Sequence, residues 1–320
     1  MTLNTRHTPT AVLAALGAAA LFGASTPLAK QFVGELSALL LAGLLYLGSG
    51  VGLLGLRLMR DRGWRKPELT RVEWPWLLGA IACGGIVGPT LLMLGLARVS
   101  AASASLLLNF EGVLTALLAW VVFKENADRR VMLGMALIVA GGLMLSWPGT
   151  PQSTLDGWQG AALIVGACLC WALDNNLTRQ VSNSDALFIA CLKGLIAAAV
   201  NIGLALLLGQ SVPPWTVAGP VLLIGFLGYG LSLTLFVVAL RGLGAARTGA
   251  YFGAAPFMGA AIAVGLFHES TSPWFWGAGL FMAVGLWLHL TERHEHPHWH
   301  GNLQHSHPHY PDMDHRHDHP

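Results

Sequence analysis

The sequence has few charged residues. Asp, Glu, Lys and Arg make up only 11% of its 320 residues, whereas an ordinary globular protein carries roughly 25%. A soluble protein of this size would be unable to cover its surface with so few charges. Hydrophobic residues contribute 54% of the chain, which excludes intrinsic disorder over most of it. These proportions predict an integral membrane protein.

Cysteine is also scarce, and the signatures of several functional classes are missing. The four cysteines, Cys83, Cys168, Cys170 and Cys191, fall in apolar runs and are predicted to be small buried hydrophobic residues. Cys168 and Cys170 would lie on nearly opposite faces of a helix, so they do not form a chelating pair. The sequence contains no nucleophile elbow, zinc-protease motif, phosphate-binding loop or DNA-binding motif. We therefore expect neither an enzyme nor a nucleic-acid partner.

Long apolar runs are what the sequence does contain. A transmembrane helix needs about 20 apolar residues, and ten runs approach this length, separated by short connections with turn residues. The predicted transmembrane helices, which make the fold all-α, are 11–29, 36–57, 74–96, 101–123, 131–148, 158–178, 186–208, 217–240, 246–267 and 274–291. The first run follows Arg6, so a cleaved signal peptide is the alternative for that segment. Its counterpart in the second half of the chain favours a permanent span.

Basic residues predict the orientation of these helices. With ten spans, both termini lie on the same side of the membrane. If that side is cytoplasmic, the inner segments hold fifteen Lys and Arg residues, whereas the outer loops hold only Lys30 and Arg98. This asymmetry satisfies the positive-inside rule. We expect a multi-pass protein of the bacterial inner membrane, with cytoplasmic N- and C-termini.

The two halves of the chain repeat each other. Segments 22–31, 96–102 and 123–125 align with segments 171–180, 240–246 and 267–269, at offsets of 149, 144 and 144 residues. Five-helix halves have an odd number of spans, so they insert in opposite senses. This is the inverted-repeat plan of secondary transporters, in which substrate binds near the midplane between the repeats. The predicted units are an N-terminus at 1–10, repeats at 11–148 and 149–291, and a disordered tail at 292–320.

The aligned segments carry a family resemblance over about residues 11–291. The pattern Phe22-Gly23-Ala24-Ser25 leads to Lys30, and its counterpart ends in Arg179. Alanine-rich hairpins join the third and fourth spans of each repeat, and Pro256 followed by Glu269 closes the ninth span. In these features the chain resembles the ten-helix EamA-type transporters of the drug/metabolite transporter superfamily. The resemblance implies a carrier of small solutes, coupled to protons or another gradient, with a cavity between its halves.

A charged residue in the fourth span points to a candidate site. A charge at a helix centre costs roughly 2.5–3.5 kcal/mol, so it usually lines a cavity or finds a partner. Glu111 stands near the midplane where the family often has proline, matching Pro256, and we expect Asn109 and Tyr251 as its neighbours. Burial favours the neutral form of this carboxyl group, which suits proton coupling. The alternative is a packing role, with the carboxyl group bonded to backbone or to Asn109.

Two further charges lie in consecutive spans of the second half. Asp174 belongs to the polar stretch Asp174-Asn175-Asn176, and Lys193 lies in the following span. At 1.5 Å per residue, their depths in the membrane differ by only a few ångströms. We expect either a buried ion pair that fixes the hairpin or a proton or substrate site in the cavity.

Aromatic residues form two groups by position. Trp171, Tyr229 and Tyr251 lie deep within spans and are candidates to line the pathway. A second group lies near span ends, as interfacial anchors do. Its members are Trp74, Trp76, Trp147, Trp158, Trp215, Trp274 and Trp276.

The segment after the last span is rich in histidine. Its ten histidines are His294, His296, His298, His300, His305, His307, His309, His315, His317 and His319. Alternating His-x-His in a flexible chain brings imidazoles together around Zn²⁺, Ni²⁺, Co²⁺ or Cu²⁺, and the prolines between them argue against a helix. We expect either a metal-buffering or metal-sensing tail or a disordered tail that binds metal adventitiously. The carrier itself is expected to require no cofactor.

Three functions follow from these features. The first is export of small organic solutes, as the resemblance implies. The second is efflux of a transition-metal ion, which the tail, Glu111 and Asp174 suggest. The third is a membrane metal sensor without transport. The expected partners are a small-molecule or ion substrate and the lipid bilayer, for a monomer or homodimer.

Overall fold

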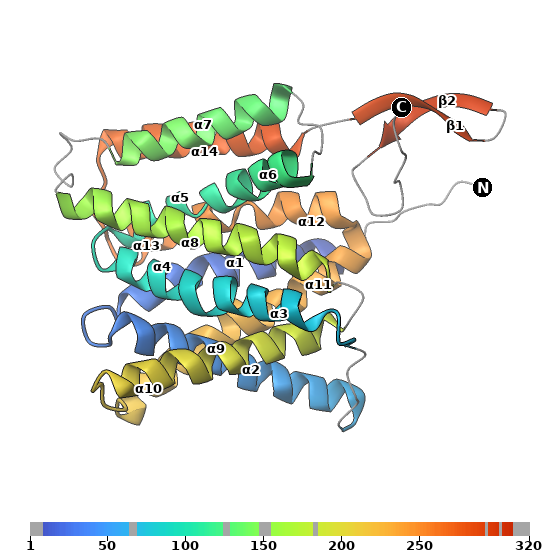
Figure 1. The fold of residues 1–320 in the computed structure, drawn as a ribbon. Helices are drawn as coiled ribbons and strands as arrows, with labels where there is room; N and C mark the ends of the chain where they lie inside the picture. The colour runs from blue at the N-terminus through green and yellow to red at the C-terminus, as the bar shows by residue number, and fades with distance from the viewer. Residues whose placement is uncertain are drawn as a thin grey trace.

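In the computed structural model the protein is a bundle of helices (Figure 1). The structure describes residues 9–63, 69–123, 129–146, 155–181, 185–291, 294–300 and 303–309. The first half contains α1 Pro9–Lys30, α2 Ala38–Asp61, α3 Trp74–Ala80, the π-helical η1 Ile81–Val87, α4 Gly88–Leu96, α5 Ala101–Leu107, α6 Phe110–Phe123 and α7 Arg129–Leu145. The second half contains α8 Leu155–Arg179, α9 Ala186–Leu207, α10 Trp215–Gly225, the π-helical η2 Phe226–Leu231, α11 Ser232–Leu243, α12 Ala245–Phe252, α13 Ala255–Gly265 and α14 Pro273–Leu290. Strands β1 His294–His300 and β2 Leu303–His309 follow.

These helices account for the ten predicted spans. Within the described ranges, eight helical stretches are long and apolar enough to cross a membrane. The other two spans are α7, with 17 residues, and α14, with 18 residues, which pack along each other. The prediction of an all-α, multi-pass membrane protein is therefore confirmed for the bundle.

Capping side chains fix where several spans begin. Ser37, Ser100, Asp185 and Ser272 precede α2, α5, α9 and α14, and each side chain accepts a hydrogen bond from a backbone N–H of the first turn. The first N–H groups of a helix have no partner within it, and the bilayer core offers no water to replace one. These polar residues therefore begin helices whose interiors are almost wholly apolar.

Both repeats interrupt their helices at matching places. In the third span of each repeat, η1 begins at Ile81 and η2 at Phe226, which is 145 residues later. The fourth span breaks at residues 108–109 between α5 and α6, and its counterpart breaks at 253–254 between α12 and α13. The second break also lies 145 residues after the first. The duplication seen in the sequence therefore extends to irregularities of the backbone.

The two repeats pack against each other through equivalent pairs of helices. Helix α1 of the first repeat packs against α11 and α13 of the second, and α8 of the second packs against α4 and α6 of the first. The pair α2 and α9 lies along one edge of the bundle, and α7 and α14 lie along the opposite edge (Figure 1). Each of these contacts joins one repeat to the other, as expected for an inverted pair sharing a central interface.

Glycine permits the closest of these crossings. A Cβ on Gly23 of α1 would stand 2.3 Å from the Ala255 carbonyl oxygen, and one on Gly259 of α13 would stand 2.6 Å from the Gly23 carbonyl oxygen. Small residues of this kind let transmembrane helices approach backbone to backbone. The two backbones therefore meet near the break between α12 and α13.

Polar contacts hold connections together at both ends of the bundle. At one end, Arg57 and Arg60 at the end of α2 form ion pairs with Asp185 before α9. At the other end, Lys30 of α1 donates hydrogen bonds to the carbonyls of Leu96 and Val99. Each end thus joins connections that are far apart in the sequence.

Two expectations differ from the structure, and others lie outside the described residues. Cys168 and Cys191 are buried, but Cys83 and Cys170 are partly exposed because the bundle surface that faces lipid is itself apolar. Residues 294–300 and 303–309 form a two-stranded antiparallel hairpin rather than a disordered segment. Alternation with period two is the pattern of a strand, which is why the His-x-His segments pair.

Six predicted interfacial tryptophans are exposed, namely Trp74, Trp76, Trp158, Trp215, Trp274 and Trp276. Trp147 and the predicted repeat boundary at 148–149 lie outside the described residues.

Candidate functional site

A buried ion pair lies between α8 and α9. The Lys193 Nζ atom lies 2.5 Å from Asp174 Oδ1 and 2.7 Å from Asp174 Oδ2. The hydroxyl of Thr178, one turn further along α8, donates to Asp174 Oδ1 at 2.9 Å. Only 7% of Asp174 is exposed. The predicted pairing of these two charges is therefore present, and both carboxylate oxygens have partners.

Glu111 lies beside this pair, in the first turn of α6. Its Oε1 atom accepts a hydrogen bond of 2.9 Å from the side-chain amide of Asn175, which neighbours Asp174 on α8. The two expected neighbours make other contacts: the Asn109 amide donates to the Leu106 carbonyl at 2.8 Å, and Tyr251 packs beside α1 and α11. Glu111 therefore belongs to the cluster on α8.

The break in the fourth span gives Glu111 its surroundings. Because α5 ends at Leu107 and α6 begins at Phe110, the carboxylate stands at the start of a half-helix. The N-terminal end of a helix carries partial positive charge and favours an anion. Around the adjacent Gly112 there is open space where a Cβ would stand. Glu111 thus has Asn175 as a hydrogen-bond partner and stands at a favourable helix end.

The π turn η1 supplies the next layer of the site. The Gly84 carbonyl accepts hydrogen bonds from the Tyr46 hydroxyl at 2.7 Å and from Trp171 Nε1 at 3.0 Å. The Gly85 carbonyl accepts one from the Asn201 side chain at 3.3 Å. Turns of π-helix often mark functional positions, and within a bilayer each displaced carbonyl must be bonded by protein. Side chains from α2, α8 and α9 therefore converge on η1.

Asp174 contacts this π turn directly. A Cβ on Gly84 would stand 1.9 Å from Asp174 Oδ2, and a Cβ on Gly228 would stand 2.5 Å from the Ser25 Cβ. Gly228 follows Gly84 by 144 residues, and the sequence alignment places Ser25 opposite Asp174. The same helix contact thus occurs in both repeats, but only the second repeat carries the charge.

Aromatic rings join the two repeats at the centre of the bundle. The rings of Tyr46 and Tyr229 stack with centroids 5.7 Å apart. Phe22 lies edge-on to Tyr229 at 5.9 Å and packs against Phe252 at 5.3 Å. Two of the predicted pathway aromatics, Trp171 and Tyr229, therefore lie around the π turns.

Sequence reasoning missed Tyr46 and Gly84. A tyrosine in an apolar run carries no signal of its own, because its partner is a backbone carbonyl. The glycines do carry one: Gly84 and Gly228 recur at the offset of 144 found for the rest of the duplication. Glycine inside an apolar run at equivalent places of two repeats indicates a close approach.

At the end of the bundle where α1 ends, polar contacts gather around the connection between α4 and α5. The Lys30 ammonium donates to the carbonyls of Leu96 and Val99, the latter at 2.9 Å. The Glu269 carboxylate accepts hydrogen bonds from the backbone N–H groups of Ala101 and Ala102, at 2.9 and 2.8 Å. Glu269 belongs to the second repeat and the two alanines to the first. This carboxylate therefore ties the repeats together at this end, which the basic residues predict to be the outer one.

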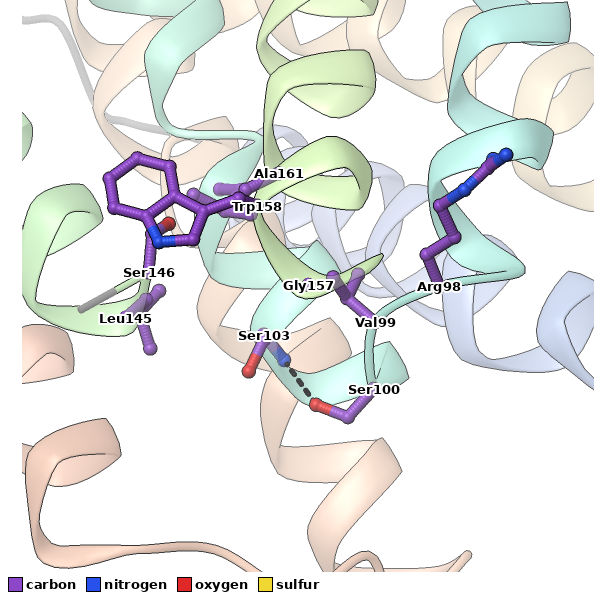
Figure 2. A pocket seen from close by; sticks show the side chains of 10 residues that line it. Arg98, Val99, Ser100, Ser103, Leu145, Ser146, Gly157, Trp158 and Ala161 are labelled. Atoms are coloured by element: carbon purple, nitrogen blue, oxygen red, sulfur yellow. Dashed lines mark hydrogen bonds between the residues drawn. The ribbon is translucent and has the colours of Figure 1, made fainter. Parts of the chain in front are cut away.

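A pocket of about 290 Å³ opens at the same end (Figure 2). Arg98 and Ser100 line it from the connection before α5, Ser103 from α5 itself, Ser146 from the end of α7, and Trp158 from α8. Figure 2 shows the Ser103 backbone N–H bonded to the Ser100 hydroxyl along one wall. None of the residues that line this pocket belongs to the Glu111 and Asp174 cluster.

The predicted metal ligands are histidines in the segment after α14. Among the residues whose side chains the structure describes, no group of three His, Cys, Asp or Glu residues is arranged to hold a metal ion. His315, His317 and His319 lie outside the described residues. The other seven predicted ligands occupy positions in β1 and β2.

Comparison with known proteins places the chain among transporters. The EamA-like transporter family matches residues 9–147 and again residues 158–291. An uncharacterized transporter of Methanothermobacter thermautotrophicus is 26% identical over 281 residues, covering 83% of this chain and 82% of that protein. The transporter YyaM of Bacillus subtilis, also uncharacterized, is 26% identical over 249 residues, covering 75% of this chain and 81% of that protein.

Two further similarities concern a part of the chain and its fold. A probable 4-amino-4-deoxy-L-arabinose-phosphoundecaprenol flippase subunit, ArnE of Pseudomonas paraeruginosa, is 41% identical over 114 residues, which are 34% of this chain and 95% of that protein. A solved structure described only as a crystal structure of a protein has a TM-score of 0.66 at 18% identity, covering 88% of this chain and 98% of that one. The latter likeness concerns the fold alone.

Proposed function

Since the chain belongs to the EamA-like transporter family and is a multi-pass membrane protein, we propose that it is a secondary active exporter of small organic solutes. We place it in the bacterial cytoplasmic membrane with both termini in the cytoplasm, as the basic residues indicate. The observation that carries the proposal is that both repeats interrupt their helices at matching places, and that the interruptions of the first repeat adjoin Asp174 and Glu111. Secondary carriers bind substrate and coupling ion at broken helices near the midplane.

In this proposal Glu111 is the coupling residue. It stands at the start of a half-helix with Asn175 as its hydrogen-bond partner. Pro256 occupies the equivalent place in the second repeat, at the start of α13. A carboxyl group that exchanges protons with whichever side is open can link solute export to proton entry. Asp174 and Lys193 then serve as the neighbouring fixed charges that hold α8 and α9 in place.

The surrounding rings favour a solute with an apolar portion. Phe22, Tyr46, Tyr229 and Phe252 pack ring to ring. The Tyr46 hydroxyl bonds to the Gly84 carbonyl, and Gly84 lies against Asp174. Aromatic faces and a carboxylate together suit an organic molecule that has one polar or charged end. The similarity to a flippase subunit named for a lipid-linked amino sugar agrees with this class. The other two functions considered from the sequence, metal efflux and metal sensing, depend mainly on the tail.

The test measures efflux from cells that lack their principal drug exporters. Cells expressing the chain are loaded with ethidium or with radiolabelled phenylalanine, and efflux is followed with and without a protonophore. We expect protonophore-sensitive efflux of at least one probe above the empty-vector rate. Glu111→Gln should reduce that efflux to the empty-vector level while membrane insertion is unchanged, because the amide cannot take up or release a proton.

Glu35→Gln is the matched control, since Glu35 is an exposed carboxylate in the loop before α2. This variant should export at the wild-type rate. Wild-type pH dependence in Glu111→Gln would assign Glu111 a packing role and turn the search for the coupling site to Asp174. Efflux of both probes at the empty-vector rate would contradict export of this solute class.

A further inference from the structure

The hairpin of β1 and β2 pairs histidine with histidine. In its register His294 is opposite His309, His296 is opposite His307, and His298 is opposite His305. Three consecutive pairs recur every second residue along both strands. The fourth pair at these alternate positions joins His300 to Leu303 and has one histidine.

We propose that these three pairs form a binding site for divalent transition-metal ions of the Zn²⁺ and Ni²⁺ class. Residues two apart in a strand share a face of the sheet, so the six paired positions belong to one face. Directly opposite positions have Cβ atoms about 4.5–5.5 Å apart. Imidazole nitrogen is a preferred ligand of both ions. Two neighbouring pairs together offer the four ligands of a tetrahedral zinc site.

The residues on the intervening positions reinforce this assignment. Glu295 is opposite Pro308, and Pro297 is opposite Ser306. Proline cannot donate to the ladder of a sheet, and an isolated two-stranded hairpin is marginal in water. Metal binding stabilises whichever state holds the ligands together. The ion is therefore the component that holds this hairpin in register.

Register distinguishes this site from a merely histidine-rich tail. If the pairing of the two strands slipped by one residue, each paired histidine would lie opposite one of the intervening residues, which belong to the other face of the hairpin. His300 is opposite Leu303, whereas His315, His317 and His319 lie outside the described residues. The site therefore depends on which histidines are present and not only on how many. It is independent of the proposed export function.

The test uses the full-length protein in detergent and ZnCl₂ as the probe. The affinity is measured by competition with a chromophoric zinc chelator at pH 7.5. His296→Ser combined with His307→Ser removes the central pair. His315→Ser combined with His317→Ser removes the same number of histidines outside the hairpin. We expect the first double variant to bind zinc about tenfold more weakly or worse, because it removes two of the four ligands from either set of neighbouring pairs. The second double variant should bind zinc as the wild type does, because it leaves the paired positions of the hairpin intact.

Two further readouts complete the experiment. Co²⁺ in place of Zn²⁺ should give the intense visible absorption of tetrahedral coordination in wild type and in the His315/His317 variant, and lose it in the His296/His307 variant. Binding should also disappear near pH 5, because imidazoles with an ordinary pKa of about 6.5 are then protonated. Equal loss of zinc affinity in the two double variants would overturn the proposal, as would a wild-type protein that does not bind zinc at pH 7.5.

Discussion

The carboxylate of Asp174 lies against the backbone of Gly84, with Oδ2 only 1.9 Å from the place where a Cβ on that glycine would stand. No larger residue fits at position 84 unless Asp174 moves. Asp174 is in turn held by Lys193 and Thr178. The π turn η1 and the ion pair are therefore one packed unit.

Replacing Gly84 should disturb this unit. We expect Gly84→Ala to lower the free energy of unfolding by about 1–3 kcal/mol, the usual cost of overpacking, and to reduce export by displacing the ion pair. The measurements are thermal unfolding in detergent and efflux. Gly55→Ala is the control, because nothing lies within 4 Å of a Cβ at that position of α2. Equal stability of the two variants would show that Asp174 shifts at little cost to accommodate a Cβ at position 84.

Removing one charge of the ion pair should lower the stability of the protein more than removing both. Lys193→Met leaves the buried Asp174 carboxylate without its cation, and breaking a buried pair in this way costs about 3–5 kcal/mol. Asp174→Asn combined with Lys193→Met removes the charge as well as its partner, and should recover much of the lost stability. Membrane expression and thermal unfolding measure both effects. A double variant that is no more stable than Lys193→Met would contradict the prediction that the two charges stabilise the protein as a pair.

Much of the fold could be predicted from the sequence because a bilayer imposes simple rules. Apolar length gives the spans, and recurring segments give the repeats. An ion pair was one of two expectations for Asp174 and Lys193, which lie at similar depth in consecutive spans, and the two side chains do pair. These predictions depend on position along the membrane normal, which a sequence specifies directly.

The details of the site depend on rotation about the helix axes, which a sequence specifies poorly. Glu111 accepts its hydrogen bond from Asn175 of α8, a partner that the sequence did not indicate. Tyr46 acts through the carbonyl of Gly84, and backbone partners carry no residue signature. The hairpin was not predicted because the alternating histidines were interpreted as metal ligands in a flexible chain, although alternation is also the pattern of a strand.

The inner end of the bundle offers a pH-dependent contribution to stability. Asp185 lies outside the spans, and its hydrogen bond from Arg60 holds the pKa of its carboxyl group below the ordinary value. A lowered folded-state pKa stabilises the protein when the carboxyl group is ionised, and the contribution is lost as pH falls through that pKa, below about 3.9. Asp185→Asn should therefore be less stable than wild type by roughly 0.2–1 kcal/mol at pH 7. The difference should shrink as the pH falls below about 3.9.

Asparagine is the informative substitution here because it is as good a helix cap as aspartate. Asp185 also accepts a hydrogen bond from the Leu187 N–H at the start of α9. Asp185→Ala removes the cap together with the charge and should cost about 1 kcal/mol more. Thermal unfolding at pH 7 and pH 3 separates the two contributions. A wild-type advantage over Asp185→Asn that persists unchanged at pH 3 would contradict the ionic origin.

Glu269 should control access from the outer end. Its two oxygens accept the N–H groups of Ala101 and Ala102, so they fasten the second repeat to the start of α5. Glutamine has one oxygen acceptor, and hydrogen bonds to a charged group contribute about 1.5–3 kcal/mol. Glu269→Gln should therefore raise the population of the open outer end by about tenfold or more, the factor that corresponds to 1.4 kcal/mol at 25 °C.

A cysteine in place of Ser105 reports that opening. Ser105 is only 1% exposed and lies in α5 against Gly259 of the second repeat. In a background whose native cysteines are replaced, a membrane-impermeant thiol reagent added outside should label Ser105→Cys slowly. Adding Glu269→Gln should speed labelling by the same factor of about ten, whereas Glu35→Gln, in an exposed outer loop, should not. If labelling is equally slow with Glu269→Gln, the carboxylate only caps α5, and the repeats are held at this end by the other contacts of α1 and α13.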